Sequence, residues 1–239
     1  GSATSLWTNA QDMVDACKAL GVNVMTMHWE AMFGEARIKE IEEKDFAGKV
    51  DIVAQNIKTT DFGDPVFKPY VIKNMNGVKV AIIGQAFPYT PIANPRWQVR
   101  NWSYGIQEES MQKTVDDARG KGAQVVVLLS HNGMDVDLKM ASRVRGIDAI
   151  MGGHTHDGVP TPVVVKNAGG QTLVTNAGSN GKFLGVLDFD VKNGKIADFR
   201  YKLLPVFANL LPADKDMQTL IDKARAPYLS KLNEQLAVT

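Results

Sequence analysis

Short, strongly apolar segments alternate with helical segments along this chain, and no other sequence feature restricts its fold as much. The segment QVVVLLS (124–130) is apolar almost throughout and short, which is typical of a strand buried on both faces. Further strands are expected at 22–27, 50–57 and 147–152, and helices at 9–20, 35–44, 107–121 and 135–145. Strands that alternate with helices form βα units, so we expect an α/β fold with a largely parallel sheet.

Other segments add antiparallel pairs. Asn76-Gly77 between two apolar runs predicts a hairpin, and the region after residue 160 reads as strand–turn–strand with Gly-Gly and Asn-Gly turns. A long amphipathic helix is expected at 214–236. The segment 85–105, rich in proline and aromatic residues, is expected to be an ordered functional loop.

Composition excludes several functional classes. The 239 residues are 44% hydrophobic and carry a formal net charge of +1, so no nucleic acid or charged membrane surface is expected as a partner. No apolar run approaches the ~20 residues of a membrane-spanning helix. The single cysteine, Cys17, has helical spacing and is expected in the core rather than as a reactive thiol.

The chain has only four histidines, and each follows a predicted strand. His28 follows VNVMTM, His131 follows VVVLLS, and His154 and His156 follow DAIMGG. Ligands bind at the carboxyl edge of open α/β sheets, so we expect the four imidazoles to meet at one edge. A single histidine at a strand end is more often structural, but four at one edge favour a metal site.

The pair His154-x-His156 is predicted to be extended, so that both rings point to the same side. Asp157 is expected to orient a ligand or to carry a proton, and Asn132 to support the site beside His131. Histidines without cysteine suit zinc, manganese or iron, and the residues do not choose among them.

Longer motifs resemble a known superfamily. GGHTH (152–156) with the upstream SHNG (130–133) resembles the metallophosphoesterases, which include calcineurin-like phosphatases and 5′-nucleotidases. The segments IGQAFPYTPIANPRW (83–97), LLSHNGMDVDLKMASRVRGIDAIMGGHTHDGVP (128–160) and FRYKLLPVF (199–207) resemble the thiosulfohydrolases of the bacterial sulfur-oxidation (Sox) system. This similarity extends over essentially the whole chain.

The resemblance implies a periplasmic hydrolase that removes sulfonate, as sulfate, from a cysteine-bound thiosulfonate on a sulfur-carrier protein. It implies two divalent ions, manganese in this family. His28, His131 and His154 would serve one ion and His156 the other. MHWE (27–30) replaces the Gly-Asn-His-Glu segment of phosphatases, so Trp29 stands in place of their general-acid histidine and Glu30 is retained.

Some features of the family pattern are missing. Met27 and Ala31 replace a glycine and a phenylalanine, and Met27 is expected to crowd His28. The superfamily's Asp-x-His and Gly-Asp metal motifs, which precede the position of MHWE in the family pattern, do not occur before it here, so at most one well-bound ion is expected. We therefore expect residues 1–239 to form a single partial catalytic domain, a partial four-layer αββα sandwich with mixed sheets, without the N-terminal metal motifs and the C-terminal substrate domain. The alternatives are a 5′-nucleotidase-like phosphoesterase and a non-catalytic metal-binding or interaction module.

Overall fold

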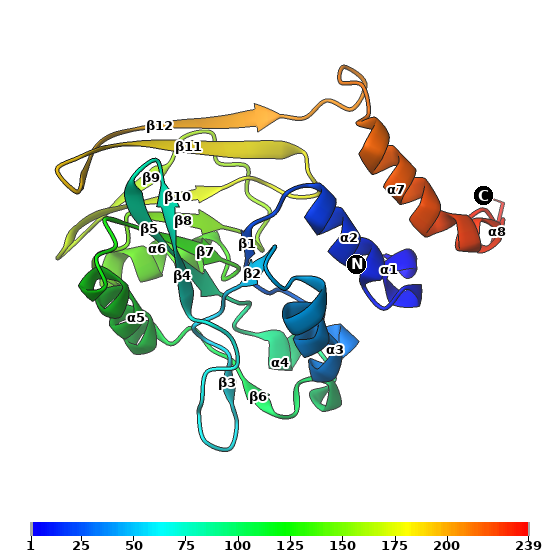
Figure 1. Cartoon of the computed structure of the whole chain (residues 1–239), viewed down its shortest axis with the longest axis horizontal. Coiled ribbons are helices and arrows are strands. Elements are labelled where there is room, and N and C mark those ends of the chain that lie inside the picture. Colours follow the sequence, from blue (N-terminus) through cyan, green and yellow to red (C-terminus); the bar gives the residue numbers. More distant parts are fainter. Residues whose placement is uncertain (1, 239) are drawn as a thin grey trace.

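The computed structural model describes residues 2–238 and is built on a six-stranded mixed sheet (Figure 1). The strand order is β4-β5-β7-β8-β10-β9. These strands are β4 Tyr70–Met75, β5 Val78–Gln85, β7 Val125–Ser130, β8 Ala149–Gly152, β9 Val163–Asn167 and β10 Gly170–Asn176. The four inner strands β5, β7, β8 and β10 are parallel, and the edge strands β4 and β9 are antiparallel to their neighbours. The predicted mixed α/β fold with several sheets is confirmed.

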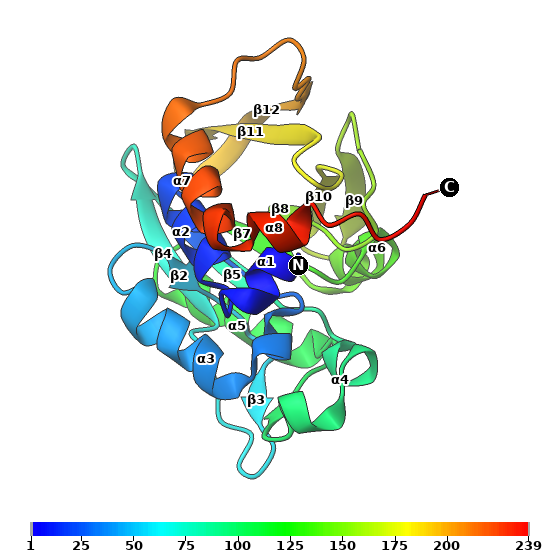
Figure 2. The ribbon, with the colours of Figure 1, turned by 90° about the vertical axis from the view of Figure 1, so that its right-hand side faces the viewer.

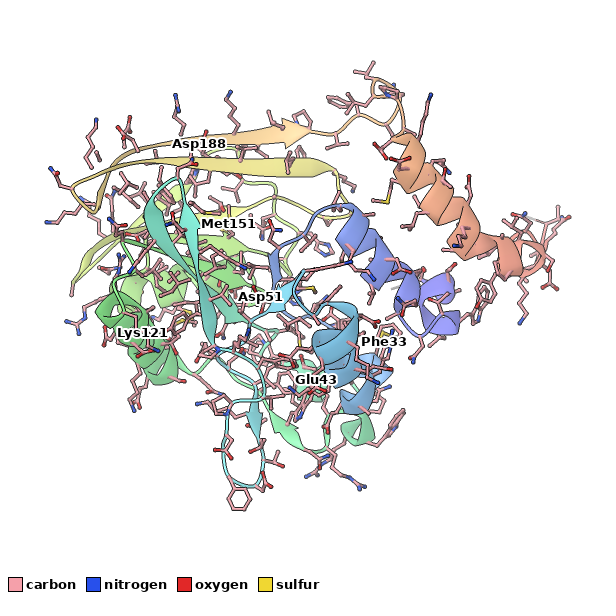
Figure 3. The ribbon with its side chains drawn as sticks, in the orientation of Figure 1. Phe33, Glu43, Asp51, Lys121, Met151 and Asp188 are labelled. Carbon is pink, nitrogen blue, oxygen red and sulfur yellow. The ribbon has the colours of Figure 1, made fainter. Side chains whose placement is uncertain are left out.

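Both faces of this sheet are covered, because its strands carry apolar side chains on both sides. Ala81 and Ile83 of β5 belong to a core with the helices α5 (Glu108–Gly120) and α6 (Met134–Arg143). Val80 and Ile82 face the other way and pack with Phe189 of a long hairpin. The hairpin strands are β11 Phe183–Lys192 and β12 Lys195–Pro205. In Figure 3, Met151 lies in the sheet and Asp188 on the hairpin beyond it.

A second core lies beside the sheet and is formed mainly by the N-terminal part of the chain. Buried Met27, Ile38, Phe46 and Ile52 pack together there. The contributing elements are α1 Ala3–Trp7, α2 Gln11–Ala19, β1 Val24–Met25, η1 Glu30–Phe33, α3 Glu35–Glu40, a π-helical turn η2 Ile41–Asp45, β2 Asp51–Ile52, β3 Lys58–Thr59 and β6 Trp102–Ser103. Figure 3 labels Phe33 and Asp51 in this region. The pairs β1–β2 and β3–β6 are small separate sheets.

Several expected elements differ in extent. The segment 85–105 contains α4 (Thr90–Ala93), η3 (Arg96–Val99) and β6, so it is more regular than the expected loop. The helix expected at 214–236 is broken into α7 (Lys215–Arg225), η4 (Ala226–Tyr228) and α8 (Leu229–Leu232). The break falls at Pro227, which has no N–H for the helical hydrogen-bond ladder.

The C-terminal helices return to the start of the chain (Figure 2). The Tyr228 ring lies 5.0 Å from that of Trp7, centroid to centroid, and its hydroxyl donates to the Trp7 carbonyl. Among residues 2–238, no helix combines the length and apolar character needed to cross a membrane.

Candidate metal centre

Three loops bring histidines together at the carboxyl ends of strands. His28 follows the short strand β1, His131 directly follows β7, and His154 lies two residues beyond β8. Because β7 and β8 are adjacent parallel strands, their carboxyl ends meet at the same edge. The loop after β1 is tied to that edge by the Phe87 N–H, which donates to the Met27 carbonyl.

The three imidazoles form a compact group. One ring nitrogen from each of His28, His131 and His154 lies within 4.8 Å of the other two. The rings of His28 and His131 stack with their centroids 3.8 Å apart, and the His154 ring lies 5.4 Å from that of His131. Among residues 2–238, no other three histidine, cysteine or carboxylate side chains bring their ligand atoms together in such a group.

The environment keeps these imidazoles neutral at neutral pH. Burial, followed by the neighbouring histidines, lowers the pKa of His28 to about 4 and that of His131 to about 3. Burial also lowers the pKa of His154. A neutral imidazole has a free nitrogen lone pair, and this is the form that binds metal ions.

The donor atoms fit a transition metal. The Nε2 atoms of His28 and His131 are buried and have no hydrogen-bond partner. Buried polar atoms without partners are rare in folded proteins, and an ion is one way to satisfy them. Three protein ligands with a further open position are typical of a catalytic zinc-type site. His28, His131 and His154 would therefore hold one ion.

Phe87 forms one wall of this site, and sequence reasoning did not single it out. Its ring stacks on His154 at 4.2 Å and meets the edges of His28 and His131 at 5.6 and 6.1 Å. Phe87 lies two residues after β5, a parallel neighbour of β7, and so reaches the same edge as the histidines. Its position after that strand was the available sequence signal.

Trp29 and Glu30 make different contacts with His28. The Trp29 ring lies 4.8 Å from the His28 ring and is 45% exposed, so it is accessible to solvent beside the site. The Glu30 carboxylate accepts the backbone N–H of His28. Burial raises the pKa of Glu30, whose side chain borders an apolar cavity of about 200 Å³. Met27 is buried in the N-terminal core.

The segment after β8 is not extended, so that prediction is wrong. His154 and His156 have φ values of +73° and +62°, and the Thr155 N–H donates to the Gly153 carbonyl, which closes a tight turn around His154. The side-chain alternation of a strand therefore does not apply. His154 joins the group of three, whereas His156 is exposed and lies outside it. A role for His156 at a second ion stays a prediction.

The hydrogen bonds of Asp157 and Asn132 join segments of the ligand loops and do not involve the histidine rings. The Thr155 hydroxyl donates to Asp157 and accepts the N–H of Met134, the first residue of α6. Asn132 is buried and bonds to Gln85 and Asp137. The supporting roles predicted for Asp157 and Asn132 stay predictions, but both residues stabilise the loops that carry His131 and His154.

Two solved structures match nearly the whole chain. The sulfate thiohydrolase SoxB of Thermus thermophilus is 35% identical with a TM-score of 0.90, over 99% of this chain and 42% of that one. A 5′-nucleotidase precursor, also from Thermus thermophilus, is 25% identical with a TM-score of 0.87, over 99% of this chain and 49% of that one. The chain therefore spans less than half of each.

Curated relatives give a similar result. The 5′-nucleotidase of Rattus norvegicus is 27% identical over 177 residues, which are 65% of this chain and 30% of that protein. The snake venom 5′-nucleotidase of Naja atra is 29% identical over 185 residues, which are 70% of this chain and 32% of that protein. No family model matches the chain. The structure thus matches SoxB and 5′-nucleotidase, two hydrolases of the calcineurin-like metallophosphoesterase superfamily.

Proposed function

We propose that this chain contributes the metal centre of a Sox thiosulfohydrolase, which removes sulfonate as sulfate from a cysteine-bound thiosulfonate on a carrier protein. The observation that carries the proposal is Trp29, whose ring lies 4.8 Å from that of the metal-site residue His28 and is half exposed. In the superfamily's phosphatases the resemblance puts a general-acid histidine at this position. An indole has one N–H donor and does not relay protons. A thiolate-type leaving group needs less protonation than an alkoxide, so this hydrolysis tolerates the replacement.

Different residues of the chain have different roles in such a site. A divalent ion, when bound, supplies Lewis-acid polarisation and activates water. His28, His131 and His154 would hold it as neutral imidazoles, and the Phe87 ring, stacked on His154, would exclude water from one side. Trp29 offers its N–H and its ring to the substrate on the open side.

Further parts of the proposal extend beyond the described site. For the complete Sox enzyme, a second ion served by His156, manganese as the metal, a sulfur-carrier protein as the partner and a periplasmic location are all inferred from the resemblance to Sox thiosulfohydrolases. The 35% identity to SoxB over nearly the whole chain supports them. We also propose that residues 1–239 form part of a single catalytic domain.

A 5′-nucleotidase-like phosphoesterase is the second candidate. The 5′-nucleotidases of Rattus norvegicus and Naja atra, and the solved nucleotidase precursor, favour it. A metal-binding module without catalysis is the third, since the group of metal-ligand side chains in residues 2–238 provides for one ion.

The test is a paired hydrolysis assay of the manganese-loaded chain and its Trp29→His variant. We expect the parent to release sulfate from a carrier-bound thiosulfonate faster than phosphate from a nucleoside monophosphate. Trp29→His should shift this ratio toward phosphate, because histidine supplies a general acid. Faster phosphate release by the parent would favour the nucleotidase. Metal binding without either hydrolytic activity would favour the non-catalytic metal-binding module.

A further inference from the structure

A group of buried polar side chains is hydrogen-bonded to the loop that carries His131. Gln85, at the end of β5, donates through Nε2 to Asn132 Oδ1 at 3.0 Å and accepts through its backbone carbonyl the N–H of His131. Asn132 in turn donates to Asp137 of α6 at 3.1 Å. Gln85, Asn132 and Asp137 are each 2% exposed or less. The hydrogen bonds thus connect Gln85 through Asn132 to Asp137.

Asp137 holds both residues that flank His131. Its Oδ1 accepts the Ser130 hydroxyl at 2.6 Å and the Asn132 amide at 3.1 Å. The Asn132 N–H donates to the same Ser130 hydroxyl at 3.2 Å, which closes a ring of hydrogen bonds around the loop. The backbone position of His131 is therefore fixed from both sides.

The second carboxyl oxygen of Asp137 faces the other ligand loop. Oδ2 is buried, has no hydrogen-bond partner, and would lie 2.8 Å from a Cβ atom at Gly152. No real Cβ is found that close to an oxygen, so this approach requires glycine. Gly152 is the last residue of β8 and precedes His154 by two residues. The Asp137 carboxyl thus lies between the His131 loop and the His154 loop.

We propose that Asp137 is a positioning residue of the metal centre, which holds the His131 loop with one carboxyl oxygen and packs the other against Gly152 of the His154 loop. The proposal rests on the proposed metal site, but Asp137 itself touches neither the ion nor the substrate. Groups that orient metal ligands at one remove commonly change metal affinity by about 10–100-fold. Because Asp137 acts through the backbone of the loops, we expect about 10-fold.

The hydrogen bonds that Asp137 accepts predict which substitution of this residue is tolerated. Burial raises the pKa of Asp137 to about 7, so a neutral side chain suits this position. In Asp137→Asn the amide oxygen still accepts from Ser130 and Asn132, whereas Asp137→Ala removes both acceptors. Ser130→Ala is milder and removes one donor. Asp148→Ala is the matched control. Asp148 is also a carboxylate that accepts hydrogen bonds, here from the backbone N–H of Val126, but it lies before β8, at the opposite end of the sheet.

The experiment measures metal binding and the histidine rings separately. Zinc affinity is measured by calorimetry and the cobalt complex by its visible spectrum, with both corrected for the folded fraction from circular dichroism. Imidazole resonances of the metal-free chain are recorded by NMR, which is practical because the chain has only four histidines.

We expect Asp137→Ala to weaken zinc binding about 10-fold, to change the cobalt spectrum, and to shift the His131 and His154 resonances. Asp137→Asn should restore all three, Ser130→Ala should give part of the effect, and Asp148→Ala should change only stability. If Asp137→Ala does not fold, the comparison of Ser130→Ala with the parent decides the outcome.

Unchanged affinity, spectrum and resonances in both Asp137→Ala and Ser130→Ala would overturn the positioning role. So would equal effects of Asp148→Ala. A parent chain that binds neither zinc nor cobalt would refute the metal centre instead, and the metal-free resonances would still decide whether Asp137 positions the two histidines.

Discussion

At the scale of single residues, the four histidines separate into three that face one another and one that faces solvent. His131 supplies a buried Nε2 without a partner, so we expect His131→Ala to abolish tight zinc binding. His156→Ala should leave it nearly intact, because a lone exposed imidazole contributes little to the site. Calorimetric titration of both variants with zinc is the measurement. Equal damage by the two substitutions would show that His156 belongs to the same ion.

The placement of three site residues could be predicted from the sequence, because each follows a strand and parallel strands end at one edge. The turn at His154 could not, since it depends on backbone hydrogen bonds within a loop. Phe87 and Asp137 were also not identified. Phe87 follows a strand as the histidines do, but a phenylalanine at that position does not by itself indicate a metal site. The role of Asp137 comes from contacts with a histidine loop, and no local pattern marks such contacts.

At the scale of elements, the packing of β5 against the segment after β2 depends on Gly84. A Cβ at Gly84 would lie 1.8 Å from the carbonyl oxygen of Val53, which is backbone and has no freedom to rotate away. We expect Gly84→Ala to destabilise the fold by about 3 kcal/mol or more, as forced overpacking does. Denaturant unfolding followed by circular dichroism measures this.

Gly120→Ala is the matched control for that prediction. Gly120 is the last residue of α5 and has no atom within 4 Å of its would-be Cβ. Alanine should be neutral there, or stabilising by up to about 1 kcal/mol, because it lowers the backbone entropy lost in a helix. Comparable stability of the two variants would contradict the close approach at Gly84.

Elements that belong to the six-stranded sheet and its helices were predicted well, and those of the N-terminal core were not. The expected helices at 107–121 and 135–145 correspond to α5 and α6, and the Asn76-Gly77 turn joins β4 to β5. The strands expected at 22–27 and 50–57 contain only the two-residue pair β1–β2. Apolar character there reflects burial in the N-terminal core, which does not require an extended ladder.

At the scale of the whole molecule, Asp137 links stability to pH. Its folded-state pKa of about 7 exceeds the unfolded value of about 3.9, so the folded chain binds more protons between these values. The contribution is complete below about pH 4 and is lost as pH rises through 7. We expect the free energy of unfolding of the metal-free parent to fall relative to that of Asp137→Asn across this range, by a few kcal/mol at about 1.4 per pKa unit.

Urea unfolding of the two proteins with a chelator present, at several pH values, measures that difference. Taking the difference cancels carboxylates such as Asp51, whose pKa is lowered by Lys73 and which acts in the opposite direction. Parallel curves for the parent and Asp137→Asn would mean that the folded chain ionises Asp137 as readily as the unfolded chain does.

The types and number of ligand side chains also determine which metal ion the molecule binds and how many ions it binds. Within residues 2–238 the metal-ligand group consists of three imidazoles without a carboxylate. Nitrogen donors bind zinc or copper more tightly than manganese, which prefers oxygen ligands. Dialysis against equal concentrations of zinc and manganese, followed by elemental analysis, should therefore find one zinc per chain and little manganese. Two ions per chain, or a preference for manganese, would require oxygen ligands to join. Asp157 and Glu30 are carboxylates close in sequence to the histidines, and their substitution tests this.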